Sequence, residues 1–463
     1  MAARSIPVPF QRRAPSAPSA LALALALPLA VALVLACAAS AQAQAPAPSR
    51  DGDLELAKSA YVLKSPAFSP EARRRAVAFI DRSARRAAAM SPTAFLLSML
   101  TIPALADNGH DVLNDSDGAW FPADRLPVRM IWFPDGWVVA RAAPEFADLL
   151  GARVSAIDGL PSAEVFRRVR SYWGGPDSSR RWNLEWFIEN GGILHALGIA
   201  PRADRLRLAV RLTDGTRTTR ELRFVPVKDV PPGRGPIRLW SAQLWTAEAE
   251  AGWQAGSGAT QPLYLEDADA PLRAVPLPEL DALYVEFRTH IDDPPGSVAR
   301  FTQAVDRELE SLQPRNLILD LRFDTGGDTE LTRDWQRTIP ARIPGRIFVL
   351  LGRYTFSAGI VAVAAFKHDG GAKVTLVGEP PGDRLVWWSE GSNVCLPYSH
   401  YCPHLTTGQW NLVSGCDGNP GCYGDKYDVV VGTLAPDLAA PLTASDWLSG
   451  RDPGMEAIRE SLP

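Results

Sequence analysis

Two short segments in the second half of the chain are almost entirely apolar, and each has the length of a β-strand. They are NLILDLR at 316–322 and RIFVLLG at 346–352. A strand that is apolar at nearly every position is typical of a parallel sheet covered on both faces. Further strands are predicted at 282–288 and 373–379, with helices at 297–312 and 356–367. Strands that alternate with helices predict an α/β domain over residues 282–463.

Residues 51–120 are predicted to form a helical cap region. Ser69 and Ser91 each precede a proline, which places a capping serine before a proline at the first helical position. Apolar residues recur at helical spacing behind both serines. We interpret the arginines between positions 73 and 86 as a solvated face of the first of these helices.

Residues 121–230 show hairpin signals. The segments 128–133 and 136–142 flank a Pro-Asp turn, and the segments 205–212 and 220–227 are joined by Asp214-Gly215. Between the hairpins, GARVSAIDGLPSAEVFRRV predicts a strand, a turn and a helix capped by Ser162. This order resembles a PDZ-like module. A proline-rich connection at 231–281 separates it from the α/β domain.

The N-terminus predicts export. Early arginines are followed by an uncharged apolar run at 21–37 and by Ala41-Gln42-Ala43, the pattern of a secretory signal peptide at 1–43. Residues 44–50 form a Pro/Ala linker. The protein is therefore expected in the periplasm or outside the cell. A lipoprotein modified at Cys37 and an uncleaved signal anchor are the alternatives.

Charge and cysteine content limit the partners. The chain has 48 Lys and Arg against 52 Asp and Glu, so its net charge of −4 lacks the basic balance of a nucleic-acid binder. No later segment is long and apolar enough to span a bilayer. Export favours disulfides over zinc at the remaining cysteines, and the spacing of His400 and His404 among them fits no common zinc pattern. We expect no metal and no cofactor. Three pairings are possible, and we favour the two that close short loops: Cys395–Cys402 and Cys416–Cys422.

Chemistry is expected at the ends of the α/β elements. Ser357 follows an apolar strand and opens a helix, where free N–H groups and the helix dipole stabilise negative charge. The N–H of Ala358 is then available to an oxyanion. Gly326 and Gly327, at the C-terminal end of the strand at 316–322, allow the backbone to approach a ligand and to point N–H groups at it, so we predict that both belong to the oxyanion hole with Ala358. A plain N-cap serine is the alternative interpretation of Ser357.

The order of four segments resembles a known family. LILDLRFDTGGD, RYTFSAG, LVGEPPGDR and GTLAPD are similar to segments of the tail-specific, C-terminal-processing serine peptidases, and the likeness extends weakly upstream to ADNGH at 106–110. The resemblance implies a ClpP/crotonase-like catalytic domain that cleaves peptides or protein C-termini. Peptide or unfolded protein substrates are therefore the expected partners.

One departure from the family changes the expected base. Ser–Lys members place a lysine after the stretch that corresponds to Gly378–Gly382, where this chain has Asp383 and Arg384. Arginine stays protonated and cannot act as a base. The resemblance to tricorn-like members implies His110 as the base that takes the proton of Ser357.

A third group must orient the imidazole, and Glu390 is our prediction for it. Two other functions remain open: an inactive peptide-binding protein that keeps the fold, and a hydrolase of small esters or amides.

Overall fold

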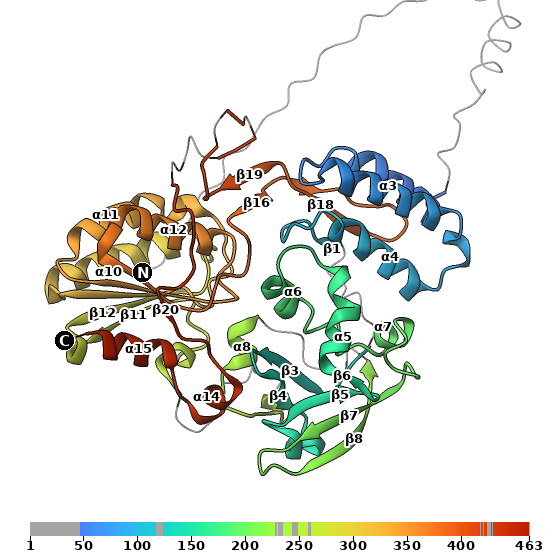
Figure 1. Cartoon of the computed structure of the whole chain (residues 1–463), viewed down its shortest axis with the longest axis horizontal. Coiled ribbons are helices and arrows are strands. Elements are labelled where there is room, and N and C mark those ends of the chain that lie inside the picture. The colour runs from blue at the N-terminus through green and yellow to red at the C-terminus, as the bar shows by residue number, and fades with distance from the viewer. Residues whose placement is uncertain are drawn as a thin grey trace, which may run out of the picture. The chain divides into compact units, whose positions relative to one another are not determined.

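The computed structural model describes residues 47–116, 124–226, 229, 235–242, 249–257, 261–416, 418, 419, 421–423, 427 and 429–462. The predicted signal peptide, the lipidation alternative at Cys37 and residues 44–46 of the predicted linker lie outside these residues. Pro48–Pro463 form one compact unit, and Figure 1 labels many of its helices and strands.

The first layer of this unit is a helical cap. Its elements are α2 (Arg50–Leu56), the π-helical turn η1 (Ala57–Val62), α3 (Pro70–Ala84), η2 (Ala87–Ala89) and α4 (Pro92–Ala104). Both predicted capping serines are confirmed: Ser69 accepts a hydrogen bond from the N–H of Ala72, and Ser91 accepts one from Ala94. The linker prediction extended one residue too far, because Ser49 caps α2 and Arg50 is already helical.

A segment from late in the chain packs on this cap. Strand β1 (Leu113–Asp115) pairs with β18 (Tyr401–Leu405), which pairs with β17 (Ser392–Asn393). The carboxylate of Asp53, in α2, accepts hydrogen bonds from the backbone N–H groups of Tyr398 and Ser399. The predicted disulfide Cys395–Cys402 is present in this segment.

The middle of the chain forms a second sheet, ordered β10-β4-β5-β7-β8, with β3 on β4 and β6 on β5. Both predicted hairpins are confirmed, and β8 begins three residues earlier than predicted. Ser162 opens a helix as expected, but it donates its hydroxyl to the carbonyl of Val154 instead of capping the helix. The strands are β3 (Val128–Phe133), β4 (Gly136–Ala142), β5 (Arg153–Ile157), β6 (Leu160–Pro161), β7 (Arg205–Arg211), β8 (Arg217–Arg223) and β10 (Gln254–Ala255), with a separate pair β2 (Asp124–Arg125) and β9 (Val225–Pro226). The helices are η3 (Pro144–Leu149), α5 (Ser162–Val169), η4 (Arg170–Tyr172), α6 (Asp177–Asn183) and α7 (Gly191–Ala196).

The outer edge of β3 is closed by side chains. The N–H of Met130 donates to Glu189 at 2.7 Å, and the N–H of Trp132 donates to Glu185 at 3.1 Å. The carbonyl of Trp132 accepts a hydrogen bond from Arg353, which belongs to the α/β domain. Three of the backbone groups through which another strand would pair with β3 are therefore already bonded.

The α/β domain contains the predicted sheet, ordered β11-β12-β13-β14-β15-β20. Neighbouring strands are parallel except for β11 against β12. The strands are β11 (Leu272–Leu277), β12 (Ala282–Phe287), β13 (Asn316–Asp320), β14 (Ile347–Leu351), β15 (Val374–Gly378) and β20 (Leu438–Ala439). The helices that cover them are α10 (Ser297–Leu312), α11 (Arg333–Arg342), α12 (Ala358–Gly370) and α15 (Pro453–Ser461).

Both faces of this sheet are buried, as its apolar strands predict. Leu317 and Leu319 of β13 pack in the cluster that contains apolar residues of α10, α11 and α12. Ile318, which points to the opposite face, packs with Met455 and Ile458 of α15. Figure 1 shows α10, α11 and α12 on one side of the sheet and α15 on the other. The helix predicted from Phe356 begins at Ala358, two residues later.

The long segment that connects β15 to β20 contains a second pair of short antiparallel strands besides β17 and β18. Strand β16 (Val386–Ser389) pairs with β19 (Gly408–Asn411), and the predicted disulfide Cys416–Cys422 is present beyond β19. The remaining short elements are α8 (Pro236–Trp240), η6 (Leu263–Leu265), η7 (Pro278–Leu280), η8 (Thr329–Leu331), η9 (Gly371–Lys373) and α14 (Ala444–Ser449). None of the helices in the described ranges has the length and apolar character needed to cross a bilayer.

Candidate active site

Ser357 occupies a strained turn between a buried strand and a helix. Strand β14 ends at Leu351, and α12 begins at Ala358. Between them Ser357 has φ 52° and ψ −121°, a conformation that a residue with a side chain adopts only at a cost of about 1–3 kcal/mol. The side chain of Thr355 holds the turn, because it donates to the carbonyl of Leu321 at 2.7 Å and accepts from the N–H of Gly352. A strained serine in a strand–turn–helix junction is the arrangement of a nucleophile elbow.

The Gly326–Gly327 turn lies directly against Ser357. A Cβ placed on Gly326 would meet the Cβ of Ser357 at 2.6 Å, so a residue with a side chain does not fit there. The N–H of Phe356 donates to the carbonyl of Asp324 at 2.9 Å and joins the two turns. The N-terminal end of α12, where the N–H of Ala358 has no acceptor among the described residues, lies at this place, and the helix dipole favours negative charge there.

The three predicted oxyanion donors differ in what their N–H groups do. The N–H of Gly326 donates to the carboxylate of Asp324 at 3.0 Å. Within the described part of the chain, the N–H groups of Gly327 and Ala358 have no acceptor. The structure therefore leaves Gly327 and Ala358 able to bind an oxyanion and engages Gly326 elsewhere.

A buried histidine and aspartate support the glycine turn. The Nδ1 atom of His290 lies 2.9 and 3.2 Å from the two carboxylate oxygens of Asp324. The backbone N–H of His290 donates to the carbonyl of Gly326, and its carbonyl accepts from Asp328. Both side chains are almost fully buried. His290 therefore supports the turn that contains Gly326 and Gly327.

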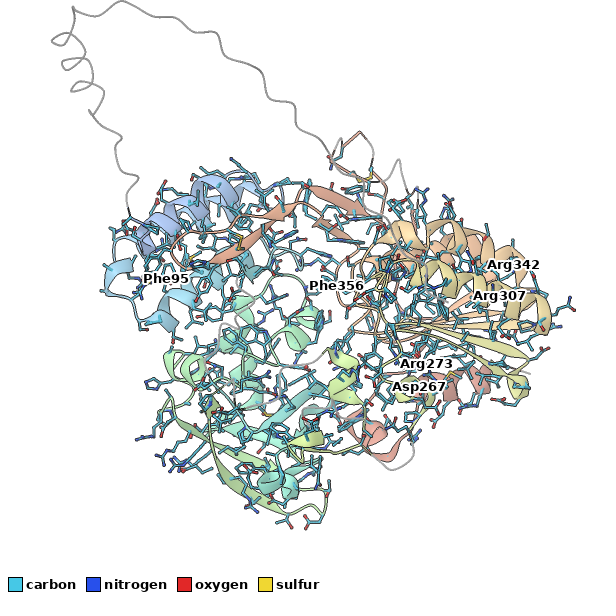
Figure 2. All side chains as sticks on the ribbon, turned by 180° about the vertical axis from the view of Figure 1, so that it is seen from behind. Phe95, Asp267, Arg273, Arg307, Arg342 and Phe356 are labelled. Atoms are coloured by element: carbon cyan, nitrogen blue, oxygen red, sulfur yellow. A yellow bond between two sulfur atoms is a disulfide. The ribbon has the colours of Figure 1, made fainter. Side chains whose placement is uncertain are left out.

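His110 lies beside the Ser357 turn. Its ring stacks on Phe356, with centroids 4.3 Å apart and planes 20° from parallel. Phe356, labelled in Figure 2, lies on the side of the α/β domain that faces the cap, where Phe95 is labelled. Asn108 fixes the His110 segment to β16, because its side chain accepts from the N–H of Trp388 and donates to the carbonyl of that residue. The fold thus brings together two predicted site residues that lie far apart in sequence.

The acidic residue that faces His110 is Asp383. Its Oδ2 lies 3.6 Å from Nδ1 of His110, and its side chain is 2% exposed. The predicted residue, Glu390, is exposed, and its carboxylate lies 3.4 Å from the hydroxyl of the neighbouring Ser389. No described contact joins Glu390 to His110. In the sequence, Asp383 stands out only because it replaces the lysine of Ser–Lys members. That position, at which a charged residue is expected near the serine, is the sequence signal that points to Asp383.

A second buried network connects the Ser357 turn to the middle sheet. Arg353 pairs with Glu379 at 2.9 Å, and the hydroxyl of Tyr354 lies 3.4 Å from Glu185. Burial raises the pKa of Glu185 to about 8, although the N–H of Trp132 and the charge of Arg353 act in the opposite direction. Glu185 is therefore largely protonated at neutral pH.

Among the described residues, no group of three or more His, Cys, Asp or Glu side chains is arranged to hold a metal ion. The four cysteines form the two predicted disulfides, Cys395–Cys402 and Cys416–Cys422.

Comparison with known proteins identifies the fold. No family model and no curated protein matches the sequence. Mature CPAF matches the structure with a TM-score of 0.55 at 11% identity, over 89% of this chain and 95% of that one. This chain has the fold of CPAF.

A complex of mature CPAF with lactacystin gives a TM-score of 0.52 at 11% identity, over 89% of this chain and 97% of the other. The match to the photosystem II D1 C-terminal processing protease covers 89% of this chain and 97% of that one at 12% identity, with a TM-score of 0.38. The CPAF likeness confirms the predicted α/β multidomain architecture.

Proposed function

We propose that the protein is an exported serine peptidase that cleaves peptides or protein C-termini through an acyl-enzyme on Ser357. The observation on which the proposal depends is the strained conformation of Ser357 at the start of α12, with His110 packed on the adjacent Phe356. Strain of this kind is kept where the surrounding structure requires it, and it is concentrated at functional sites. The fold of CPAF, a serine peptidase, supports the same reaction class.

The proposed reaction uses four groups. The Oγ of Ser357 attacks the carbonyl carbon of the scissile peptide while Nε2 of His110 takes the hydroxyl proton. The carbonyl oxygen becomes an oxyanion, which the N–H groups of Gly327 and Ala358 stabilise. His110 then gives its proton to the amine nitrogen as the C–N bond breaks. Water attacks the acyl-enzyme by the reverse route and releases the carboxylic acid.

Both nitrogens of His110 are suited to this role. They are buried, and neither makes a hydrogen bond within the described part of the chain. A neutral imidazole has one donor and one acceptor nitrogen, so both remain available for a proton relay. Two aromatic rings lie nearly parallel to the imidazole, Phe356 with its centroid at 4.3 Å and Trp387 at 6.3 Å, and they restrict its orientation.

We also propose that residues 282–463 form a ClpP/crotonase-like domain and that residues 121–230 form a PDZ-like module. The parallel sheet with helices on both faces supports the first assignment, and the hairpins with the strand–turn–helix segment support the second. Capture of a chain end by strand addition to β3 has a specific obstacle. Glu185, Glu189 and Arg353 occupy the backbone groups of that edge and must leave before a peptide can pair there.

Labelling of the purified protein with a fluorophosphonate probe tests the proposal. The probe modifies an activated serine, so the wild type is expected to react and Ser357→Ala is expected not to react. Labelling that survives the substitution would overturn the assignment of Ser357. A folded wild type that stays unlabelled would favour the inactive peptide-binding alternative, and a comparison of peptide with small-ester hydrolysis would then separate the two hydrolase functions.

A further inference from the structure

We infer that Asp383 is the positioning residue that orients His110 and stabilises its protonated form, in the place that the sequence assigned to Glu390. This inference rests on the proposed function, because it requires His110 to act as the base. It depends on three observations: the distance between the two side chains, their burial, and the packing that fixes the carboxylate.

The carboxylate of Asp383 is aimed at His110. Its Oδ2 lies 3.6 Å from Nδ1 of the imidazole, while its Oδ1 accepts a hydrogen bond from the N–H of Arg384 at 2.8 Å. Oδ2 is buried and has no hydrogen-bond partner within the described residues, and the same is true of both His110 nitrogens. Buried polar groups without partners are rare, and two that face each other indicate a contact that the reaction completes.

The distance of 3.6 Å is slightly longer than a hydrogen bond. Catalytic hydrogen bonds in structures without substrate are often long and shorten in the complex. When His110 takes the serine proton, its ring becomes positively charged. The buried carboxylate of Asp383 then stabilises that charge by an interaction weakly screened by water.

The glycine that precedes His110 makes room for this carboxylate. A Cβ on Gly109 would lie 2.4 Å from Oδ2 of Asp383, so the carboxylate fits only against a residue without a side chain. A Cβ on Gly175 would lie 3.3 Å from the Cα of Gly109 and 3.5 Å from Oδ1 of Asp383. The aspartate is thus enclosed by the backbone that bears His110.

The other charged groups near His110 are engaged elsewhere. Asp107 pairs with Arg180 and with Arg384. Asp111 accepts hydrogen bonds from Tyr61, Asn108 and Thr406.

Glu390 makes no described contact with His110. It is exposed, and its carbonyl oxygen lies 2.9 Å from Nε2 of His404. Asp383 is therefore the carboxylate that the described structure offers to His110.

The test compares the fluorophosphonate labelling rates of the full-length wild type, Asp383→Asn and Glu390→Gln over a range of pH. We expect Asp383→Asn to slow labelling by about 10²–10⁴-fold, because the amide stabilises the imidazolium poorly and favours the wrong tautomer. We also expect the midpoint of its pH–rate profile to fall by about one pH unit. Glu390→Gln is expected to label within about twofold of the wild type. Circular dichroism checks that each variant is folded.

Each outcome bears on a different statement. A wild type that does not label contradicts the proposed function. A wild type that labels, with Asp383→Asn as fast and with the same pH midpoint, overturns the present inference, as does a larger loss in Glu390→Gln. If Asp383→Asn does not fold, Asp383→Ser replaces it and the same two results decide. Slower labelling with a lowered pH midpoint supports the positioning role, and wild-type labelling with an unchanged midpoint overturns it.

Discussion

At the scale of single residues, the site depends on glycines that leave space for functional groups. Gly326 has φ 95° and lies so close to Ser357 that its own Cβ would overlap the Cβ of the serine. Gly109 makes the same kind of room for Asp383. The motif containing Gly326 was recognised from the sequence, whereas nothing in the sequence shows which atom occupies the space beside each glycine.

Replacement of Gly326 by alanine is expected to damage both stability and labelling. The positive φ and the contact at 2.6 Å together predict a loss of about 1–3 kcal/mol in the free energy of unfolding. The displaced Ser357 is expected to label at least about tenfold more slowly. Urea unfolding and probe labelling measure the two effects.

Gly215→Ala is the matched control for this substitution. Gly215 has φ 89°, close to that of Gly326, but a Cβ placed on it meets nothing within 4 Å. The backbone penalty is therefore similar in the two variants, and only Gly326→Ala adds the clash. Equal labelling by both variants would show that the contact with Ser357 is unimportant.

At the scale of elements, the two disulfides lie beside different strands. Cys402 lies in β18 opposite Asn114 of β1, and β1 begins three residues after His110. The N–H of His404 donates to the carbonyl of Val112 in the same region. The backbone of Cys422 instead forms an isolated β-bridge with Gln409 of β19. The sequence predicted both pairings from short loop lengths, but the tertiary structure determined which strands lie beside each disulfide.

Replacement of Cys395 and Cys402 by serine is expected to loosen the β1–β18 pair. The chain-entropy model gives a loss of about 2–3 kcal/mol in stability for a loop of this length. Hydrogen exchange is expected to accelerate at the N–H groups of β1 and β18, including that of His404. Replacement of Cys416 and Cys422, which close a loop of similar length, should leave those amides unchanged; equal acceleration in both variants would contradict the expectation.

At the scale of the whole molecule, a buried acidic network connects the middle sheet to the catalytic turn. Glu185 bonds the N–H of Trp132 in β3, while Arg353 bonds the carbonyl of the same residue and pairs with Glu379. These contacts close the β3 edge against another strand. They also make the position of the Ser357 turn depend on the sheet formed by residues 128–223.

This network predicts that stability falls with rising pH. Burial raises the pKa of Glu185 to about 8 in the folded state, above its ordinary value of 4.5. The folded state therefore binds one proton more than the unfolded state between these values, and stability falls there by roughly 1.4 kcal/mol per pH unit. The contribution is fully present below pH 4.5 and is lost as the pH rises through 8.

The variant Glu185→Gln isolates this effect. Urea unfolding of both proteins at pH 5, 6, 7 and 8 is expected to show a shallower decline for the variant, since glutamine does not titrate. The other ionisable groups are common to both proteins and cancel in the difference. Identical pH slopes would mean that Glu185 titrates in the folded protein as it does in the unfolded chain.

The sequence by itself determined the features that arise from local rules. Apolar strands alternating with helices predicted the α/β sheet, Ser-Pro pairs predicted the starts of α3 and α4, and loop length predicted both disulfides. Each depends on residues a few positions apart, whose preferences for burial, capping or turn formation act before the chain is folded.

Only the tertiary structure decided which distant side chains meet. It placed His110 on Phe356, turned Asp383 and not Glu390 toward the imidazole, engaged the N–H of Gly326 with Asp324, and closed the edge of β3 with Glu185 and Glu189. These contacts depend on the paths of loops and on packing between segments far apart in the chain. A shift of a few ångströms in one loop exchanges one carboxylate for another, and no local sequence pattern fixes a position that closely.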